Sequence, residues 1–364
     1  MEQWIKCTLG DILNFRRGHD LPKTSMQAGN IPVAGSNGVI GYHNECTPSS
    51  PCITIGRSGN VGTPYIYDTC WAHNTVLYID DYKGNDPKYL YYLLKTLPLS
   101  SFGGGSAVPT LNRNHIHPFE ILFCKDLSEQ KRIANLLSKI DDKIELNRQI
   151  NDNLEQQASN LFQDWLNNCE NSIMLRELTD NVLDYTPNTH KHVYLLNSSD
   201  VTEGQFTVLP LTPNINLKGQ FKKRFKKGDI LYSEIRPRNR HYAYCYFDAD
   251  KYIASTRLIV LRAKPEMLTS SILLYQYLML NNVFEEFTLK TESRSGTFPQ
   301  GNYEDLSSIK VPYGASQEQI SKALESIYKQ LWTNLEENER LEALRDSLLP
   351  KLMSGELKIN EIDC

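Results

Sequence analysis

The chain has 364 residues, a formal net charge of -4 and 40% hydrophobic residues. These values are ordinary for a folded protein of two or three domains and argue against disorder. No apolar run approaches the ~20 residues of a membrane-spanning helix, and no secretory signal opens the chain. The eight cysteines are scattered, without a C-x-x-C pair, which predicts reduced thiols in a cytoplasmic protein.

In chain order, two turn-rich regions alternate with two long helical segments. Residues 1–127 hold short β-like runs at 31–35, 39–43, 52–56, 64–68 and 75–80, then a helix-like segment at 88–97. Residues 128–168 predict one long helix. Residues 172–315 hold runs at 192–197, 228–235, 242–247 and 257–263, then a helix-like segment at 271–280. Residues 316–358 predict the second long helix and a tail. The pattern indicates an α/β (α+β) class with two globular domains.

The second half repeats the first with a period near 190 residues. Residues 105–116 read GSAVPTLNRNHI and residues 295–306 read SGTFPQGNYEDL, and each is followed by a short strand and a long helix. Asn112 aligns with Asn302. The loops and charges differ between the copies, which favours two similar tasks on two different targets.

Both long helices carry a heptad pattern in which two asparagines interrupt an apolar stripe. The predicted helix-pairing residues are Ile133, Leu137, Ile140, Ile144, Asn147, Asn151 and Leu154 in the first helix, and Ile320, Leu324, Ile327, Leu331, Asn334, Asn338 and Leu341 in the second. Asparagine in a coiled-coil seam costs stability but specifies register and partner. We therefore predict an antiparallel pair, about 50 Å long at ~1.5 Å per residue, with asparagine facing asparagine. Such a pair would place the domains at opposite ends, related by a pseudo-twofold axis. The alternative is two helices that cover separate cores.

Motifs for catalysis or metal binding are weak or missing in the sequence. It contains no N-P-P-Y or F-x-G-x-G methyltransferase motif and no phosphate-binding P-loop. The glycine-rich loop at 56–62 fits a strand-connecting turn or a DNA backbone contact. Two pairs of histidines and one group of three cysteines lack the spacing of a tetrahedral zinc site. The histidines are His115, His117, His190 and His192, and the cysteines are Cys46, Cys52 and Cys70. We therefore expect binding rather than catalysis, and no metal.

The order of eight short motifs resembles the specificity (S) subunits of type I restriction-modification systems over nearly the whole chain. The motifs are LGDI (9–12), GSNGVIGY (35–42), ITIGRSGNVG (53–62), GSAVPTLN (105–112), SEQKRIANLLSKID (128–141), GDILYSEIRP (228–237), SQEQI (316–320) and LLPKLMSGEL (348–357). One departure is SGTFPQGN in the second copy, where the first has GSAVPTLN.

The resemblance implies two target-recognition domains, 1–127 and 172–315, separated by two antiparallel conserved helices. Each domain would read one half of a bipartite double-stranded DNA site, and the helices would set the gap. Two methyltransferase (M) subunits would dock on the helices, and restriction/translocase (R) subunits would join for cleavage. This chain would be non-catalytic, with S-adenosylmethionine, ATP and Mg²⁺ in the partner subunits.

Candidate DNA-binding residues are those that can bond phosphates or base edges. Between residues 218 and 241, nine Lys or Arg outnumber two acids. The candidates in the second domain are Lys222, Lys223, Arg224, Arg236, Arg238, Asn239, Arg240, His241 and Arg294. In the first domain they are Arg16, Arg17, Asn37, Arg57, Ser58, Asn60, His73 and Asn74. The alternative for each set, without a role in DNA binding, is a solvated basic loop or an ordinary turn.

Two other classes of function stay open at this point. A scaffold with two protein-binding modules is disfavoured by the basic loop of the second domain. A self-contained modification enzyme is disfavoured because the methyl-donor motif is missing.

Overall fold

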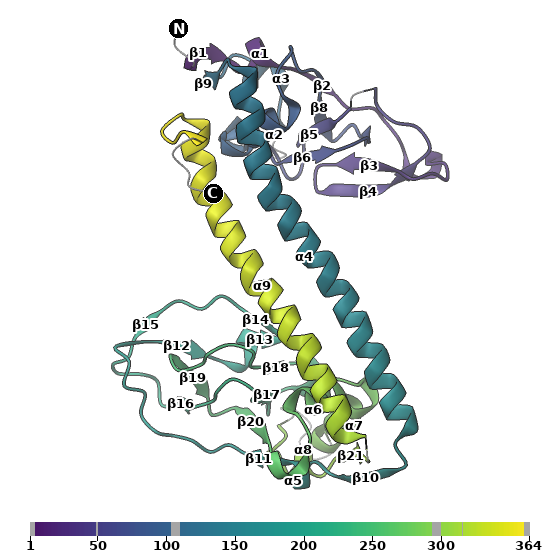
Figure 1. Cartoon of the computed structure of the whole chain (residues 1–364), viewed down its shortest axis with the longest axis vertical. Helices are drawn as coiled ribbons and strands as arrows, with labels where there is room; N and C mark the ends of the chain where they lie inside the picture. The colour runs from purple at the N-terminus through teal and green to yellow at the C-terminus, as the bar shows by residue number, and fades with distance from the viewer. Residues whose placement is uncertain (1–3, 49, 103–109, 293–299, 315, 360–364) are drawn as a thin grey trace. The chain divides into compact units, whose positions relative to one another are not determined.

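The computed structural model describes residues 4–48, 50–102, 110–292, 300–314 and 316–359 (Figure 1). The chain forms two compact units: Met1–Asn147 with Glu336–Cys364, and Arg148–Leu335. Each unit contains one turn-rich domain and about half of each long helix. In the described part of the chain, no helix combines the length and apolar character needed to cross a membrane.

The first domain is built on a four-stranded sheet of order β2-β8-β5-β6, with a three-stranded sheet of order β4-β3-β7 and the pair β1-β9. The strands are β1 (Trp4–Thr8), β2 (Asn14–Arg17), β3 (Ile31–Gly35), β4 (Gly38–His43), β5 (Cys52–Gly56), β6 (Pro64–Tyr67), β7 (Trp71–Ala72), β8 (Val76–Asp81) and β9 (Glu120–Cys124). The short helices are α1 (Leu9–Ile12), η1 (Lys23–Ser25), α2 (Pro87–Thr96), η2 (Leu99–Phe102) and α3 (Arg113–Ile116).

Strand β5 is buried at every position because a hydrophobic cluster covers each of its faces. Ile53 and Ile55 belong to the main core, and Cys52 belongs to a smaller cluster on the opposite face. Helix α2 closes the main core. It begins where the Asp86 carboxylate accepts the backbone N–H of Tyr89 (2.9 Å) and Pro87 occupies the first turn.

The second domain repeats this plan with a sheet of order β11-β20-β17-β18, a sheet of order β15-β12-β19-β16, and the pairs β10-β21 and β13-β14. Its strands are β10 (Asn171–Met174), β11 (Thr179–Asn181), β12 (His192–Leu196), β13 (Val201–Thr202), β14 (Gln205–Phe206), β15 (Thr212–Pro213), β16 (Phe221–Lys223), β17 (Ile230–Ser233), β18 (Tyr242–Tyr244), β19 (Tyr252–Ser255), β20 (Leu258–Ala263) and β21 (Lys310–Tyr313). Its short helices are α5 (Leu175–Leu178), η3 (Ser198–Asp200), η4 (Pro237–Asn239), η5 (Pro265–Met267), α6 (Ser271–Leu278), α7 (Asn281–Glu292) and α8 (Tyr303–Ser307).

The topology bears out the repeat seen in the sequence. In the four-stranded sheets β2-β8-β5-β6 and β11-β20-β17-β18, the strands are arranged in the same order relative to the chain: first, fourth, second, third. The pairs β3-β7 and β12-β19 are both parallel. Asn112 and Asn302 are both helix N-caps, at α3 and α8. The predicted fold class, mixed helix and sheet in two domains with long helices, is therefore confirmed. Parts of the repeated turns, 105–109 and 295–299, lie outside the described residues.

The helical content of the second domain exceeds the sequence prediction. We expected one helix at 271–280, and the structure has α6 followed by α7. The two asparagines that open α7, Asn281 and Asn282, have low propensity for a helix interior but are accepted at a helix start. They separate α6 from α7, which the apolar pattern alone would join into one helix.

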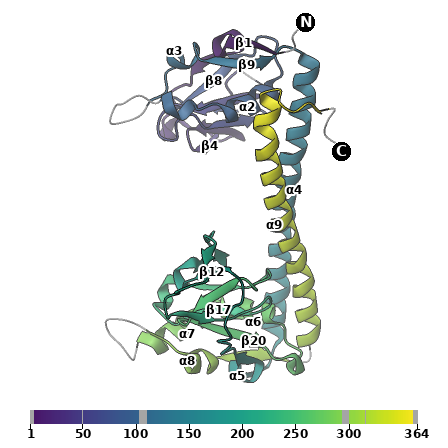
Figure 2. The ribbon, with the colours of Figure 1, turned by 90° about the vertical axis from the view of Figure 1, so that its left-hand side faces the viewer.

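The long helices are α4 (Leu127–Asn168) and α9 (Gln317–Met353). Within each unit, the parts of the two helices lie side by side and antiparallel (Figure 2). In the first unit, Asn147 Nδ2 donates to Asn338 Oδ1 (2.9 Å), and Arg345 pairs with Asp141 (2.8 Å) two turns away. In the second unit, Asn334 Nδ2 donates to Asn151 Oδ1 (2.8 Å). All four asparagines are buried, so asparagine meets asparagine in both units.

The outer turns of both helices also serve the domain cores. Ile133 and Leu137 join the main core of the first unit, and Ile320 and Leu324 join that of the second. Among the other predicted seam residues, Leu154, Ile327 and Leu341 are half-buried and the rest are buried. The two interpretations offered by the sequence therefore apply to different stretches: helix–helix pairing in the middle, and core coverage at the ends.

Candidate nucleic-acid interface

A cavity of about 420 Å³ in the first unit gathers four arginines. Strand β2 supplies Arg16 and Arg17, the turn after β5 supplies Arg57, and helix α3 supplies Arg113. The structure thus brings together three candidates from the sequence and adds Arg113, which the sequence analysis missed. The sequence feature that could have identified Arg113 is its position directly after Asn112, which caps helix α3 and also lines the cavity.

Backbone and carboxylate contacts hold these arginines. The carbonyl of Arg57 accepts the N–H of Leu111 (2.7 Å), which ties the β5 turn to the segment before α3. Arg113 Nη1 donates to the carbonyl of Phe15 (3.3 Å), and Arg16 pairs with Asp80. Guanidinium groups held in this way can bond phosphates or the O6 and N7 acceptors of guanine.

The other first-domain candidates lie in turns, and none of them is among the described residues that line this cavity. Asn37 is exposed in the turn between β3 and β4. A Cβ at Gly59 (φ +84°) would lie 3.3 Å from Ser36 Oγ, which places that turn against the 58–60 loop. Of the remaining candidates, Ser58, His73 and Asn74 are half-buried and Asn60 is exposed.

Three of these side chains have local partners. His73 Nδ1 lies 3.1 Å from the hydroxyl oxygen of Thr75. Asn60 accepts the hydroxyl of Thr63 (2.9 Å), and Asn74 bonds to Asp20. The glycine-rich loop itself closes as a turn, because the N–H of Gly62 donates to the carbonyl of Gly56 (2.8 Å). The structure therefore supports the turn interpretation of this loop and leaves a DNA contact as a prediction.

In the second unit, the basic loop is a short helical turn held by helix α7. Arg238 makes a two-pronged bond to Glu292 (2.7 and 2.9 Å), which lowers the pKa of that carboxyl and raises the pKa of the guanidinium. Arg240 donates to Asn281 (2.9 Å) and lies 4.7 Å from the ring centre of Phe284. The loop is thus pre-organised rather than a solvated coil.

The backbone of this loop is also specialised. Arg236 (φ 47°) and Arg240 (φ 52°) both adopt the left-handed conformation, one on each side of η4. Arg236 and Asn239 are exposed, and His241 Nδ1 lies 2.8 Å from the carbonyl oxygen of Val201. Left-handed non-glycine residues carry strain that surrounding structure must offset. The contacts with α7 supply that support. The acidic residues of α7 could have predicted these contacts from the sequence.

The predicted phosphate stripe needs a correction at Lys223. Its side chain is 3% exposed, and Nζ donates to the carbonyl of Leu258 (2.6 Å). Burial lowers the pKa of this amine. Alternation along β16 turns Lys222 outward and Lys223 inward, so Lys223 cannot belong to a surface stripe. Arg224 is half-buried and donates to the carbonyl of Asp250 (3.1 Å), and Arg294 lies outside the described residues.

Metal-binding residues do not cluster in the described part of the chain. No group of three His, Cys, Asp or Glu there could hold a metal ion. His117 Nε2 accepts the backbone N–H of Phe15 (3.1 Å), which is a structural role. The thiols of Cys52 and Cys70 are buried and 2.8 Å apart.

The family model for the type I restriction modification DNA specificity domain matches residues 1–156 and 210–343. The chain belongs to this family. The matched segments of the specificity domain include both the arginine cavity and the η4 loop.

Two curated relatives are named specificity subunits of type I restriction enzymes. The type I restriction enzyme HindI specificity subunit of Haemophilus influenzae is 34% identical over 163 residues, which cover 44% of this chain and 35% of that protein. The MjaIX specificity subunit of Methanocaldococcus jannaschii is 39% identical over 82 residues, 21% of this chain and 19% of that protein. The matched part thus spans about a third and about a fifth of these relatives.

A solved structure shares the fold over almost the whole chain. The S subunit of a type I restriction-modification system from M. genitalium has a TM-score of 0.69 at 19% identity, covering 96% of both chains. The specificity-domain fold, with its long helices, is therefore shared at low sequence identity.

Proposed function

We propose that this chain is the non-catalytic, sequence-specific DNA-recognition subunit of a type I restriction-modification enzyme. Each domain reads one half of a bipartite site in double-stranded DNA. The observation that carries the proposal is a duplicated specificity fold, matched in both halves, whose two copies present different cationic surfaces.

The two surfaces suit different half-sites. The first domain offers guanidinium groups in a cavity, and the second offers the η4 loop with Asn239 exposed. Arginine bonds guanine bidentately and asparagine bonds adenine bidentately in the major groove. Identical scaffolds with unlike contact residues would read unlike sequences.

The long helices are proposed to dock two M subunits. Large apolar side chains stand in solvent on them: Leu146 (51% exposed) and Leu344 (47%) in the first unit, and Leu161 (41%) and Leu335 (39%) in the second. Exposed apolar residues on an otherwise polar helix pair favour partner helices. The M subunits would supply S-adenosylmethionine chemistry on a flipped adenine, and two R subunits would supply ATP- and Mg²⁺-dependent cleavage in the cytoplasm.

The same helices are proposed to set the gap between half-sites. Buried asparagine pairs specify one register of α4 on α9. Since a helix rises about 1.5 Å per residue and DNA turns once in about 34 Å, helices of this length suit half-sites about one turn apart.

Methylome sequencing of cells that carry this chain with its M subunit tests the proposal. We expect one bipartite motif with a constant gap. Exchange of residues 172–315 for those of a relative should change one half-site and leave the other half-site and the gap intact. Loss of a bipartite motif in the wild type, or a change in both half-sites after the exchange, would contradict the proposal.

A further inference from the structure

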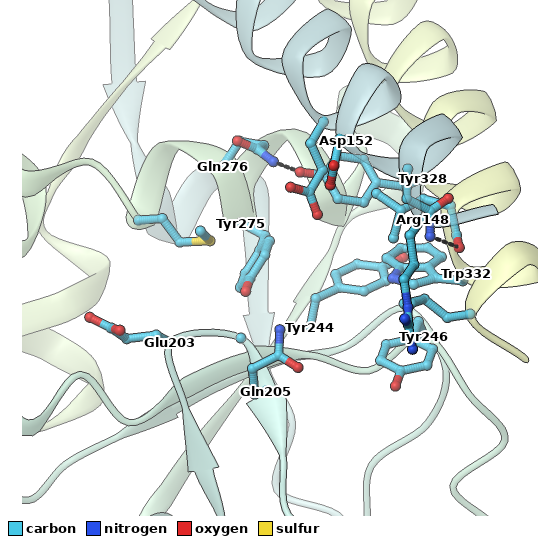
Figure 3. A pocket seen from close by; sticks show the side chains of 16 residues that line it. Arg148, Asp152, Glu203, Gln205, Tyr244, Tyr246, Tyr275, Gln276, Tyr328 and Trp332 are labelled. Atoms are coloured by element: carbon cyan, nitrogen blue, oxygen red, sulfur yellow. Dashed lines mark hydrogen bonds between the residues drawn. The ribbon is translucent and has the colours of Figure 1, made fainter. Parts of the chain in front are cut away.

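A pocket of about 460 Å³ lies in the second unit (Figure 3), and its described lining includes none of the candidate DNA-binding residues. Side chains from α4, α9, α6, β18 and the turn between β13 and β14 line it. The pocket therefore has one wall from the paired helices and one from the domain. A ligand seated here would contact both.

The helix α9 side of the pocket carries an aromatic stack. The ring of Trp332 stacks on Tyr244 (4.9 Å, 8°) and on Tyr246 (5.4 Å, 12°), and Tyr328 lies 5.3 Å from Trp332. Tyr275 of α6 extends the wall 5.9 Å from Tyr244. Aromatic faces carry partial negative charge and attract cations, arginine most often.

The charged residues that line this pocket are mainly acidic: Asp152, Glu155 and Glu203, against Arg148. Asp152 and Glu155 are three residues apart on α4 and so lie on one face of it. Burial, and then Asp152, raise the pKa of the Glu155 carboxyl. Burial, and then Glu155, raise the pKa of Tyr328 to about 12, so carboxylate and ring lie within electrostatic reach. Glu203 lies 3.6 Å from Arg240 Nε, which leaves the α4 acids as the main anionic group.

We propose that this pocket binds an arginine side chain presented by the M subunit. The inference rests on the proposed function, because it places that partner on α4 and α9. A planar guanidinium can stack on aromatic rings while it donates to a carboxylate, which the compact ammonium of lysine does less well. The excess of carboxylates disfavours a phosphate of DNA.

The position of the pocket connects partner docking with the helix seam. Asn151, which accepts from Asn334, also lines the pocket. Asn151 lies about one helical turn from Glu155 on α4, so an arginine docked on the α4 carboxylates would sit beside the asparagine pair that specifies register. A partner bound in this pocket would therefore contact α4 and α9 at the place where their asparagine pair fixes the register.

The first experiment follows the indole ¹⁵N NMR signals of the full chain, which has four tryptophans. The Trp332 signal is assigned with Trp332→Phe. We expect it to shift with Nα-acetyl-arginine amide, with a Kd of about 1–10 mM, and not with the neutral isostere Nα-acetyl-citrulline amide. The double variant Asp152→Asn/Glu155→Gln should weaken binding at least about tenfold. The control Glu266→Gln, an exposed acid in η5 away from the pocket, should not. Equal shifts with both compounds, or none with arginine amide, would overturn the proposal.

The second experiment measures the affinity of the co-expressed M subunit for the full chain without DNA. We expect Asp152→Asn/Glu155→Gln to weaken it about 10- to 100-fold and Glu266→Gln to leave it unchanged. An unchanged affinity for the double variant would sink the assignment of the partner. If the wild-type pair methylates a bipartite site while the Trp332 signal does not shift with arginine amide, the pocket inference alone fails. If Trp332 responds but the wild-type pair methylates no bipartite site, the proposed function fails.

Discussion

The buried asparagine pair of the second unit allows a quantitative test of the helix seam. Asn334 is 4% exposed and Asn151 is 6% exposed. Asn334 donates to Asn151 (2.8 Å) and accepts from Gln330 (2.8 Å), and Asn151 Nδ2 donates to the carbonyl of Leu331 (3.2 Å). The variant Asn334→Leu removes the first two bonds and leaves Asn151 Oδ1 buried without that donor.

The expected loss follows from these contacts. An intramolecular hydrogen bond contributes about 1 kcal/mol net, and a buried polar atom left unpaired costs about 1–3 kcal/mol. Gln330 is exposed to solvent, so its bond to Asn334 counts for less. Asn334→Leu should therefore lower the free energy of unfolding of the second unit by about 2–3 kcal/mol. Asn151→Leu should cost a similar amount, whereas the double leucine variant should be near neutral because no polar atom is stranded and the seam becomes apolar.

Urea unfolding followed by circular dichroism, together with hydrogen exchange of the amides at 148–158, measures these differences. Thr333→Leu, on the exposed face of the same turn, is the control and should change stability by less than about 0.5 kcal/mol. We expect a large favourable coupling between the two leucines. If the double variant lost the sum of the single losses, the pair would not act as a hydrogen-bonded unit.

Further predictions concern DNA binding and the loop of the second domain. Arg57→Ala should weaken specific binding by the assembled methyltransferase about 5- to 150-fold and relax one half-site only, as methylome sequencing would show. Lys222→Ala should reduce the slope of log affinity against log salt by about one, whereas Lys223→Met should leave both affinity and slope unchanged; a slope change at Lys223 would contradict its burial. Because Arg238 lowers the pKa of Glu292, the stability from this pair is complete above the ordinary glutamate pKa of about 4.3 and is lost as pH falls through the lowered value. Glu292→Gln should remove that pH dependence of loop hydrogen exchange, and an unchanged profile would refute it. Removal of one heptad from each helix, about 10 Å, should shorten the recognised gap by about three base pairs at 3.4 Å each without changing either half-site.

The helices and the repeat were predictable because their signals are local. A stripe with a spacing of three and four residues places side chains on one helix face whatever surrounds it, and matching asparagines in both stripes indicated the antiparallel partner. The order of strands and turns, present twice, predicted the class of both domains. The formation of turns and helices depends on neighbours within a few residues.

The binding surfaces depended on tertiary structure. Arg16, Arg57 and Arg113 share a cavity although many residues separate them in the chain, and no local pattern announces such a meeting. Lys223 carries a charge that predicts exposure, yet strand pairing turned it inward toward the carbonyl of Leu258. Sequence by itself determined the two long helices, how they pair, and the repeat that relates the two domains. Only the packing of distant segments decided which cations converge and where the aromatic pocket opens, because those contacts depend on the whole fold.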